Sequence, residues 1–528
     1  MSTTTIADKI EAFAREPTER VFCSLVLEDA SVQDITYSHF LNIINKAATW
    51  LDESLPRPTS ASDFPTFSYV GDLNLRRLAL VVAGAKTGRK ILMVRRYALR
   101  DTIAHLITET KCTTFLYEPS DSDAMESQVG DQNAIRLTLP AWDTWFCNAT
   151  TTAYRSAEPR ERSLDDPVCI FHTSGSTGNP KPIVWTERRI SCYTSVEYLR
   201  DVFKSQGARM VSTFPLIHVG GTMTALFWPL YLGSVATLLE TGVPSSPDDV
   251  FRMLQLSRAT LLAAQPSLLT SIASSVDMVS RINGLSRILT GSAPLSTAVI
   301  DRLQEGNGPT ILNLYGSTET LPLCQRFDDQ DDWPYISFKE DSGVSFRRET
   351  DDLYELILKK TASEQVLSVF CSLPELDTFE SKDLFSPHPQ KSGLWRFVCR
   401  KDDLVSLAGG QGINVGDMEM RIQESPLVDT AIIGMDGRPA TMLLVVPEQQ
   451  PVNDQERASV QDAIWPFVER ANEHAHPYAA VQKNMVLVLQ TREKLSATTD
   501  KGSLKRQSVI EQYKADIDRV YSAARSSS

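Results

Sequence analysis

The sequence predicts an α/β protein with a large N-terminal lobe and a small C-terminal lobe. Two observations lead to this prediction. Helical stripes alternate with short β-branched runs through most of the chain, and a smaller version of the same pattern follows the acidic pair Asp402–Asp403. At about 150 residues per domain the 528 residues correspond to three or four units, and two large domains fit as well. We expect the lobes at 1–402 and 403–528.

In the first part of the chain, predicted strands alternate with predicted helices. A parallel sheet covered by helices requires this alternation. A strand-like ITY begins at residue 35 and leads into a helix over 38–55, whose apolar residues recur on one stripe. Residues 76–95 read as a helix followed by the strand ILMV, and residues 99–117 repeat that order. The pattern predicts further strands at 210–217, 233–239, 260–264, 287–290 and 310–314.

The later elements differ in character. The polar, acidic segment 326–353 is typical of loops between antiparallel strands, and a punctuated region at 386–394 precedes the apolar run 395–398. After residue 403 we expect a smaller α/β pattern with a helix near 454–473 and a strand over 484–490.

Composition excludes some classes of partner. The net charge of −13 argues against a sequence-independent grip on nucleic acid or an anionic membrane, because both need excess Lys and Arg. The eight cysteines are scattered and form no CxxC pair, as expected of buried, reduced thiols in a cytoplasmic protein. No apolar run approaches the ~20 residues of a membrane span, and the first residues do not read as a signal peptide.

Several common motif templates fail. Gly is never followed directly by Lys, so the nucleotide-binding loop GxxxxGK[ST] is absent. The GxG at residues 410–412 has no third glycine at the dinucleotide-binding position, and neither HExxH nor GxSxG occurs.

The strongest chemical signal lies at 169–186, where an apolar strand runs into a loop rich in glycine and hydroxyl groups. Two glycines among four hydroxyls let backbone N–H groups turn toward one point, which makes an anion nest. Lys181 adds a compact positive charge. A merely flexible loop is the alternative, but this loop is fixed between a buried strand and Pro-Lys-Pro. The candidate phosphate-binding residues are Thr173, Ser174, Gly175, Ser176, Thr177, Gly178 and Lys181.

This segment resembles the phosphate loop of the adenylate-forming superfamily, which includes acyl-CoA synthetases, luciferases and adenylation domains of nonribosomal peptide synthetases. Residues 313–320, NLYGSTET, resemble the YGxTE motif of that family. The resemblance implies that Tyr315 stacks on adenine, that Thr318 contacts phosphate and that Glu319 holds Mg²⁺, for which a carboxylate is a suitable hard ligand. It also implies two α/β subdomains and a small β subdomain in the large lobe, and a mobile α+β small lobe.

Further segments resemble the family in the expected order. Asp383 resembles the aspartate that accepts hydrogen bonds from both ribose hydroxyls, although Ser-Lys replaces the usual Thr-Gly before it. Arg400 would also reach the ribose and Asp402 would be the hinge, although Cys399 replaces a glycine; a surface salt bridge is the alternative interpretation. A strand end resembling that of the substrate pocket is formed by Gly291, Ser292 and Ala293.

The last motif departs from the family pattern. Lys and Gly are exchanged at 501–502, and Gly412 stands where arginine is usual. We assign the adenylation lysine to Lys501, with Lys505 as the substitute; it would stabilise charge as pyrophosphate leaves. A basic helix face is the alternative interpretation.

The resemblance implies a reaction that needs ATP and Mg²⁺. A carboxylic acid becomes an acyl-adenylate, and a phosphopantetheine thiol, on a carrier protein or CoA, then displaces AMP. The closest resemblance is to adenylation domains of fungal adenylate-forming reductases, which implies a downstream reductase or thioesterase; the chain ends soon after Arg506, as an excised domain or a stand-alone ligase would. The alternatives are an acyl-CoA ligase and a degenerate nucleotide-binding homologue.

The acid itself is constrained by residues 202–239, which contain no Asp or Glu to pair with an α-ammonium group. Residues 215–221, PLIHVGG, resemble the PxxHxGG of aryl- and acyl-activating members, with His218 lining the pocket. We therefore expect an aryl, α-keto or aliphatic acid rather than an ordinary α-amino acid.

Overall fold

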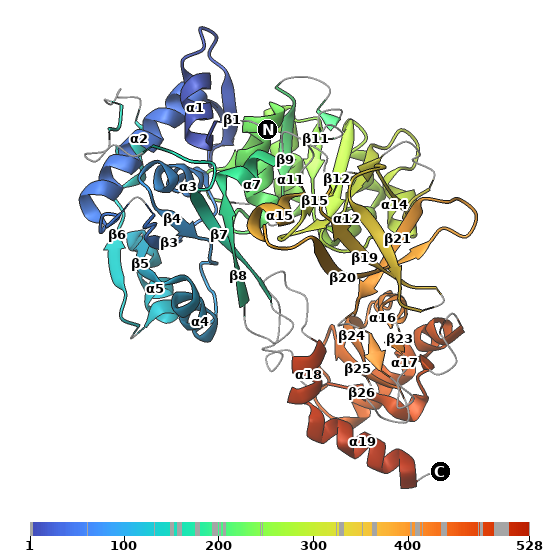
Figure 1. Ribbon diagram of the computed structural model, residues 1–528. Coiled ribbons are helices and arrows are strands. Elements are labelled where there is room, and N and C mark those ends of the chain that lie inside the picture. Colours follow the sequence, from blue (N-terminus) through green and yellow to red (C-terminus); the bar gives the residue numbers. More distant parts are fainter. Residues whose placement is uncertain are drawn as a thin grey trace.

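The structure is a computed structural model in which three large sheets and a two-stranded hairpin precede Lys401, and two smaller sheets follow in the described residues (Figure 1). It describes residues 4–60, 62–130, 132–147, 153–155, 161–174, 180–192, 199, 202–203, 207–242, 244, 246–323, 325–326, 332–350, 352–361, 367–401, 404–406, 412–413, 415–434, 441–473, 475, 479–489 and 506–526.

The first six-stranded sheet takes its strands from residues 66–186 and has the order β6-β5-β3-β4-β7-β8. All neighbours are parallel except the hairpin β7–β8. Helices separate β3, β4 and β5 along the chain, because parallel neighbours need crossover connections. The elements are β3 Thr66–Val70, α3 Leu75–Lys86, β4 Lys90–Leu92, α4 Arg100–Thr110, β5 Cys112–Tyr117, α5 Ser122–Val129, β6 Ile135–Thr138, α6 Trp142–Phe146, β7 Pro167–Ser174, β8 Pro180–Thr186 and α7 Glu187–Ser191.

The second sheet has seven strands in the order β13-β12-β11-β9-β10-β1-β2, and only the β1–β2 pair is antiparallel. Strand β1 joins β10 across more than half of the lobe's sequence, which brings the N-terminal segment into this sheet. The elements are α1 Ile6–Ala14, β1 Val21–Val26, β2 Val32–Thr36, α2 Tyr37–Ser54, β9 Arg209–Ser212, α9 Val219–Thr222, α10 Trp228–Leu232, β10 Val235–Leu239, α11 Pro247–Ser257, β11 Leu261–Ala263, α12 Pro266–Ala273, α13 Val276–Ser280, β12 Arg287–Gly291, α14 Thr297–Leu303 and β13 Thr310–Leu314.

A third, wholly antiparallel sheet has the order β16-β17-β21-β20-β19-β18. It follows a two-stranded hairpin, β14–β15, that leaves the end of β13. The elements are β14 Gly316–Ser317, β15 Leu321–Pro322, β16 Gln325–Arg326, β17 Ile336–Phe338, β18 Val344–Arg348, β19 Tyr354–Lys359, α15 Ser368–Ser372, β20 Thr378–Pro387 and β21 Leu394–Arg400.

The C-terminal part is drawn in orange and red at the lower right of Figure 1. Its three-stranded sheet has the order β24-β25-β26, and a separate pair joins β22 to β23. We keep residue 402 as the proposed boundary, because separate apolar clusters lie before and after it. The elements are β22 Val405–Ser406, β23 Gly412–Ile413, α16 Gly416–Ile422, β24 Val428–Gly434, β25 Met442–Pro447, α17 Asp454–Glu473, β26 Val486–Val488, α18 Arg506–Gln512 and α19 Lys514–Ser526.

The first two sheets share one apolar core. It contains Phe67 of β3, Phe22 of β1 and Trp185 of β8, each at most 1% exposed. Burying side chains of this size removes the most apolar area from water, so the two sheets stabilise each other. This shared core therefore fixes the position of the β7–β8 hairpin relative to the strand ends of the second sheet.

The α/β prediction is confirmed, and the periodic segments form the expected elements. Helix α2 occupies the predicted segment and begins at an N-cap, where Thr36 Oγ1 accepts a hydrogen bond of 3.2 Å from His39 N. Strand β9 is much shorter than predicted, because it ends at Ser212 rather than at 217. Pro215 has no N–H to give to a ladder, and the chain turns there toward α9.

Candidate active site

The β7–β8 hairpin brings the two described ends of the candidate phosphate loop together. Thr173 lies opposite Lys181, and Ser174 lies opposite Pro180, in antiparallel register. Lys181 is exposed, so its ammonium group is available to an anion beside this end of the hairpin. Four candidate residues between these strands, Gly175, Ser176, Thr177 and Gly178, lie outside the described residues.

Thr318 and Glu319 lie at the turn of the β14–β15 hairpin. Ser317 Oγ accepts hydrogen bonds from the backbone N–H groups of Glu319 (3.1 Å) and Thr320 (3.2 Å), which fixes the turn from within. At Gly316 an added Cβ would lie 2.2 Å from the Leu321 carbonyl oxygen, so the hairpin requires glycine at that position. Both candidate side chains are half-buried, so part of each side chain contacts solvent.

A buried arginine donates hydrogen bonds to the backbone of this turn. Arg189 of α7 is fully buried, and its Nη2 lies 2.5 Å from the carbonyl oxygens of both Thr318 and Glu319. Its Nη1 donates to Ser372 Oγ of α15 at 2.7 Å. Because α7 directly follows β8, this guanidinium ties the β7–β8 hairpin to the turn of Glu319. Sequence reasoning missed Arg189, since ERR at 187–189 looks like an ordinary surface charge run.

Tyr315 connects the second sheet to the third. Its phenol donates a hydrogen bond of 2.6 Å to Asp383 Oδ2. Its ring packs against Phe385 at a centroid distance of 5.0 Å, and its N–H donates to Gln325 Oε1 at 2.8 Å. Burial, together with the nearby negative charge of Asp383, raises the pKa of Tyr315 well above its ordinary value. The phenol is therefore a hydrogen-bond donor throughout the useful pH range.

Asp383 and Arg400 face each other across β20 and β21. They are directly paired in the strand register, and Arg400 Nε lies 3.5 Å from Asp383 Oδ1. Asp383 thus has a phenol at one oxygen and a guanidinium at the other. Half of the Arg400 side chain is exposed, which leaves donors facing solvent. The structure brings Tyr315, Asp383 and Arg400 together; their roles toward a nucleotide remain predictions.

The candidate pocket residues Gly291, Ser292 and Ala293 begin at the end of β12. Gly291 is buried and pairs with Leu314, the neighbour of Tyr315. A Cβ at Gly291 would lie 2.5 Å from the Leu314 carbonyl oxygen, so the close approach of these strands requires glycine. Ser292 has a positive φ of 74°, and both Ser292 and Ala293 are exposed. The end of β12 therefore lies next to the strand that leads into Tyr315.

His218 lies where the two α/β sheets meet. It precedes α9, and its Nε2 is 3.3 Å from Nη2 of Arg95, which follows β4 of the other sheet. Both residues are half-buried. Sequence reasoning missed Arg95, because its contact with His218 joins residues 123 positions apart.

The remaining candidates lie beyond the described residues: the hinge Asp402, the lysine Lys501 and its substitute Lys505. Within the described ranges no group of three or more His, Cys, Asp and Glu gathers as a metal site. Mg²⁺ characteristically uses one or two carboxylates together with phosphate oxygens and water. The half-buried carboxylate of Glu319 fits that ligand class.

The cysteines depart in two ways from the expectation of scattered, buried thiols. Cys147 is exposed. Cys192, the C-cap of α7, and Cys371 of α15 are far apart in sequence, but their Sγ atoms lie 3.4 Å apart. Helices α7 and α15 also meet at the hydrogen bond from Arg189 to Ser372. The spacing of these residues in the sequence does not predict that they lie close together.

In the portion that the structure describes, no helix combines the length and apolar character needed to cross a bilayer.

Comparison with known proteins gives two family matches. Residues 10–338 match the family model described as AMP-binding enzyme, and residues 402–525 match the model described as AMP-binding enzyme C-terminal domain. A carboxylic acid reductase of Neurospora crassa is 26% identical over 93% of this chain and 48% of its own. An adenylate-forming reductase of Heterobasidion annosum is 28% identical over 80% of this chain and 39% of its own. The chain thus spans about half the length of these curated relatives, or less.

The fold also matches solved structures. The anthranilate CoA ligase AuaEII in complex with anthranoyl-AMP superposes with a TM-score of 0.73 at 15% sequence identity, covering 97% of this chain and 98% of that one. At this identity the likeness concerns the fold alone.

Proposed function

Because this chain belongs to the AMP-binding enzyme family, we propose that it activates a carboxylic acid with ATP and passes the acyl group to a thiol. The observation that carries the proposal is the contact between Tyr315 and Asp383. These residues belong to two motif segments 68 positions apart, and their side chains meet at a hydrogen bond of 2.6 Å. Arg189 joins the β7–β8 hairpin to the same region through the turn of Glu319.

In the first step a carboxylate oxygen attacks the α-phosphorus of ATP, and the bond to pyrophosphate breaks. We propose that the hairpin of Thr173 and Lys181, together with Thr318, binds the phosphates and neutralises their charge. Lys501, or Lys505 in its place, stabilises the charge that develops as pyrophosphate leaves. Glu319 would hold Mg²⁺, which would supply further charge neutralisation for the phosphates.

In the second step a thiolate sulfur attacks the acyl carbonyl carbon, and the bond to AMP breaks. AMP leaves with both electrons of that bond, and the thiol proton passes to solvent. Lys501, or Lys505 in its place, serves only the first step. We therefore propose that the C-terminal lobe rotates about Asp402 between the two steps.

We propose an acid without an α-ammonium group. Residues 202–239 contain no carboxylate that could pair with such a group. The guanidinium of Arg95, 3.3 Å from His218, places a positive charge beside this candidate pocket residue. A substrate ammonium would be repelled there, whereas an aryl, α-keto or aliphatic acid would not.

The proposed acceptor is the phosphopantetheine thiol of a carrier protein. The names of the two relatives, a carboxylic acid reductase and an adenylate-forming reductase, support a thioester that a reductase consumes. We also propose that a reductase or thioesterase is the partner and that the protein is cytoplasmic.

The test is pyrophosphate release with ATP and Mg²⁺, measured over a panel of aryl, keto, fatty and amino acids. We expect release with a non-amino acid, its loss on chelation of Mg²⁺, and its loss in Lys181→Ala and Lys501→Ala. If Lys505→Ala removes release and Lys501→Ala does not, the lysine role moves to Lys505.

Acceptors are compared in the same assay by mass analysis. A phosphopantetheinylated carrier protein should gain the mass of the acyl group, while formation of acyl-CoA instead would identify a CoA ligase. Fastest release with an ordinary α-amino acid would contradict the substrate class. Binding of ATP without release for any acid would contradict the adenylation proposal and favour a nucleotide-binding homologue.

A further inference from the structure

Glu355 of β19 is an acidic residue buried in the third sheet, where only 1% of its side chain is exposed. One carboxylate oxygen, Oε1, accepts a hydrogen bond of 3.2 Å from the backbone N–H of Lys382. The other, Oε2, lies 2.7 Å from Arg347 Nη2 and 3.3 Å from Lys401 Nζ. A buried carboxylate is costly unless it is paired, and these three contacts supply its partners.

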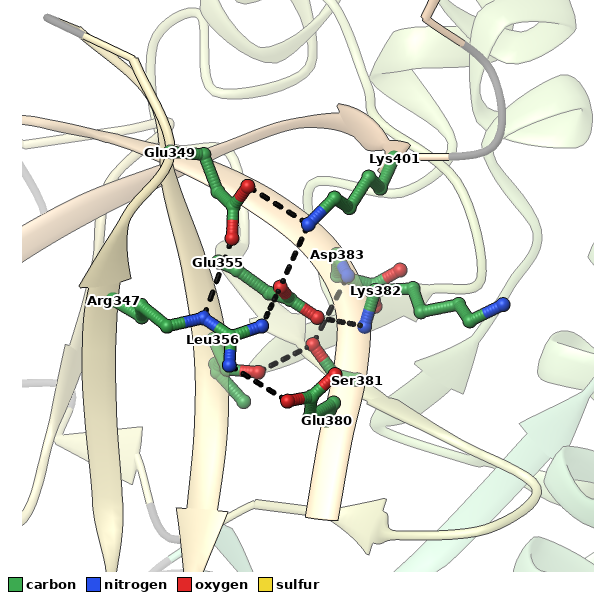
Figure 2. Close-up of polar contacts among 9 residues, drawn as sticks. All are labelled: Arg347, Glu349, Glu355, Leu356, Glu380, Ser381, Lys382, Asp383 and Lys401. Atoms are coloured by element: carbon green, nitrogen blue, oxygen red, sulfur yellow. Dashed lines mark hydrogen bonds and ion pairs between the residues drawn. The ribbon is translucent and has the colours of Figure 1, made fainter.

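The contact with Lys382 lies within strand β20, in the irregular stretch 381–383 that we call the turn of Asp383. Strands β19 and β20 lose regular register between Glu355 and Ile357, and Lys382 has a positive φ of 61°. Ser381 Oγ donates to the Leu356 carbonyl oxygen at 2.7 Å and accepts from Asp383 N at 3.0 Å. Figure 2 shows these contacts, with the Lys382 ammonium pointing away from Glu355. The turn is thus fixed by two side chains, those of Glu355 and Ser381.

The contact with Lys401 lies beside the proposed hinge. Lys401 Nζ is 2.8 Å from Glu349 Oε2 in addition to its contact with Glu355 (Figure 2). Hydrogen bonding to Glu349 raises the pKa of Lys401 and lowers that of Glu349, so both stay charged at neutral pH. Lys401 directly precedes Asp402. One carboxylate therefore contacts both the turn of Asp383 and the residue next to the hinge.

We propose that Glu355 is a positioning residue for nucleotide binding. Its carboxylate holds Asp383 toward the ribose and links the turn of Asp383 to Lys401, the residue before the proposed hinge. The inference rests on the proposed function, because Asp383 has a ribose to bind only if the chain binds ATP. Without Glu355 the backbone N–H of Lys382 loses this acceptor on β19, so the positive φ at Lys382 is no longer held from that side. Asp383 would then lose its orientation relative to Tyr315 and Arg400.

The test measures binding of ATP and of 2′,3′-dideoxy-ATP to the full chain by calorimetry. Glu355→Ala should weaken ATP binding about tenfold, the scale of losing a hydrogen bond to a charged group. Its effect on dideoxy-ATP should be less than about twofold, because that nucleotide lacks the hydroxyls that Asp383 binds. A general structural weakening would reduce both affinities alike.

Two further variants keep the inference testable if Glu355→Ala folds poorly. Glu355→Gln retains an oxygen that can accept from Lys382 N, so ATP affinity should remain within about threefold of the wild type. Glu380→Gln is the matched control. Glu380 also pairs with Arg347, at 2.6 Å, but it is half-exposed, and we expect unchanged affinity for both nucleotides.

A double-mutant cycle tests the link to the hinge. Lys401→Met alone should weaken ATP binding about threefold, the scale of a half-exposed ion pair. In the Glu355→Ala background the same substitution should have no further effect, because Lys401 acts on the turn through Glu355. Additive effects would overturn the link.

The outcomes separate this inference from the proposed function. If the wild type binds ATP and prefers it to dideoxy-ATP, but Glu355→Ala keeps that preference, the positioning role is wrong and the function stands. If the wild type binds no ATP, the proposed function fails and the inference fails with it.

Discussion

Tyr315 donates a hydrogen bond of 2.6 Å to Asp383, so the residue expected to face adenine and the residue expected to face ribose form one unit. Tyr315 follows the last strand of the second sheet, and Asp383 lies in the third. The arrangement of these sheets therefore sets the position of both residues relative to a nucleotide.

The first prediction concerns this hydrogen bond. Tyr315→Phe keeps the ring among Phe338, Phe385 and Phe397 but removes the donor to Asp383. We expect the KM for ATP in pyrophosphate release to rise about tenfold, with little change in kcat, because a hydrogen bond to a charged group is lost. Tyr335→Phe, in the same sheet region beside His388, is the control. An unchanged KM would show that Asp383 is oriented without Tyr315.

The second prediction concerns Arg189. Arg189→Met removes the donor shared by the carbonyls of Thr318 and Glu319, so the turn loses its support. We expect kcat at saturating ATP to fall about a hundredfold, because a displacement of about 1 Å near the reacting atoms can have that effect. The variant should also need more Mg²⁺ for half-maximal rate.

Two variants accompany Arg189→Met. Arg189→Lys should restore little activity, because an ammonium lacks the planar fork that reaches several acceptors. Arg188→Met, which removes a surface pair with Asp165, should behave as wild type. Equal losses in the Arg188 and Arg189 variants would contradict the specific role of Arg189.

The third prediction is a pH dependence of stability at Glu187. Burial raises the pKa of Glu187 to about 8 from a model-compound value of 4.5, while its Oε2 accepts a hydrogen bond of 2.9 Å from Ile6 N. The folded state therefore binds more protons than the unfolded state between these pH values, so rising pH lowers stability there, by at most about 1.4 kcal/mol per pH unit.

Glu187→Gln keeps an acceptor for Ile6 but has no charge to bury. The variant should gain stability relative to wild type as pH rises from 4.5 to about 8, and the difference should be constant above that range. Thermal unfolding of both proteins across this pH range measures the difference. The exposed Glu109→Gln should show none, and a pH-independent difference for Glu187→Gln would refute the assignment.

The fourth prediction compares two glycines. Gly291→Ala places a Cβ 2.5 Å from the backbone oxygen of Leu314, which cannot rotate away, whereas Gly284→Ala meets nothing within 4 Å. We expect Gly291→Ala to lower the free energy of unfolding by about 1–3 kcal/mol, the range for overpacking, and to raise the KM for ATP because Tyr315 adjoins Leu314. Equal stability of the two variants, measured by urea unfolding, would contradict the steric argument.

Much of the fold was predictable because its signals are local. The apolar stripe of α2, the buried strands and the glycine- and hydroxyl-rich segment after β7 depend on residues close in sequence. The pairing of β1 with β10 was not predictable, since any parallel strand could have taken that place.

The candidate site divides in the same way. Tyr315, Asp383 and Arg400 were found through motifs, and the fold brings them together. Arg189, Arg95 and Glu355 belong to no motif that we used. Each acts through contacts with distant segments, and each looks in the sequence like an ordinary surface charge. Burial in the folded chain is what distinguishes Arg189 and Glu355 from the many exposed residues of the same type.

The most direct measurement of the central claim follows oxygen from the acid into the nucleotide. The protein is incubated with ATP, Mg²⁺, a thiol acceptor and the panel of acids labelled with heavy oxygen in the carboxylate, and the nucleotide product is analysed by mass. We expect AMP that carries one heavy oxygen atom, because a carboxylate oxygen attacks the α-phosphorus and stays on AMP when the thiol takes the acyl group. AMP without label, or ADP with heavy phosphate, would contradict this expectation.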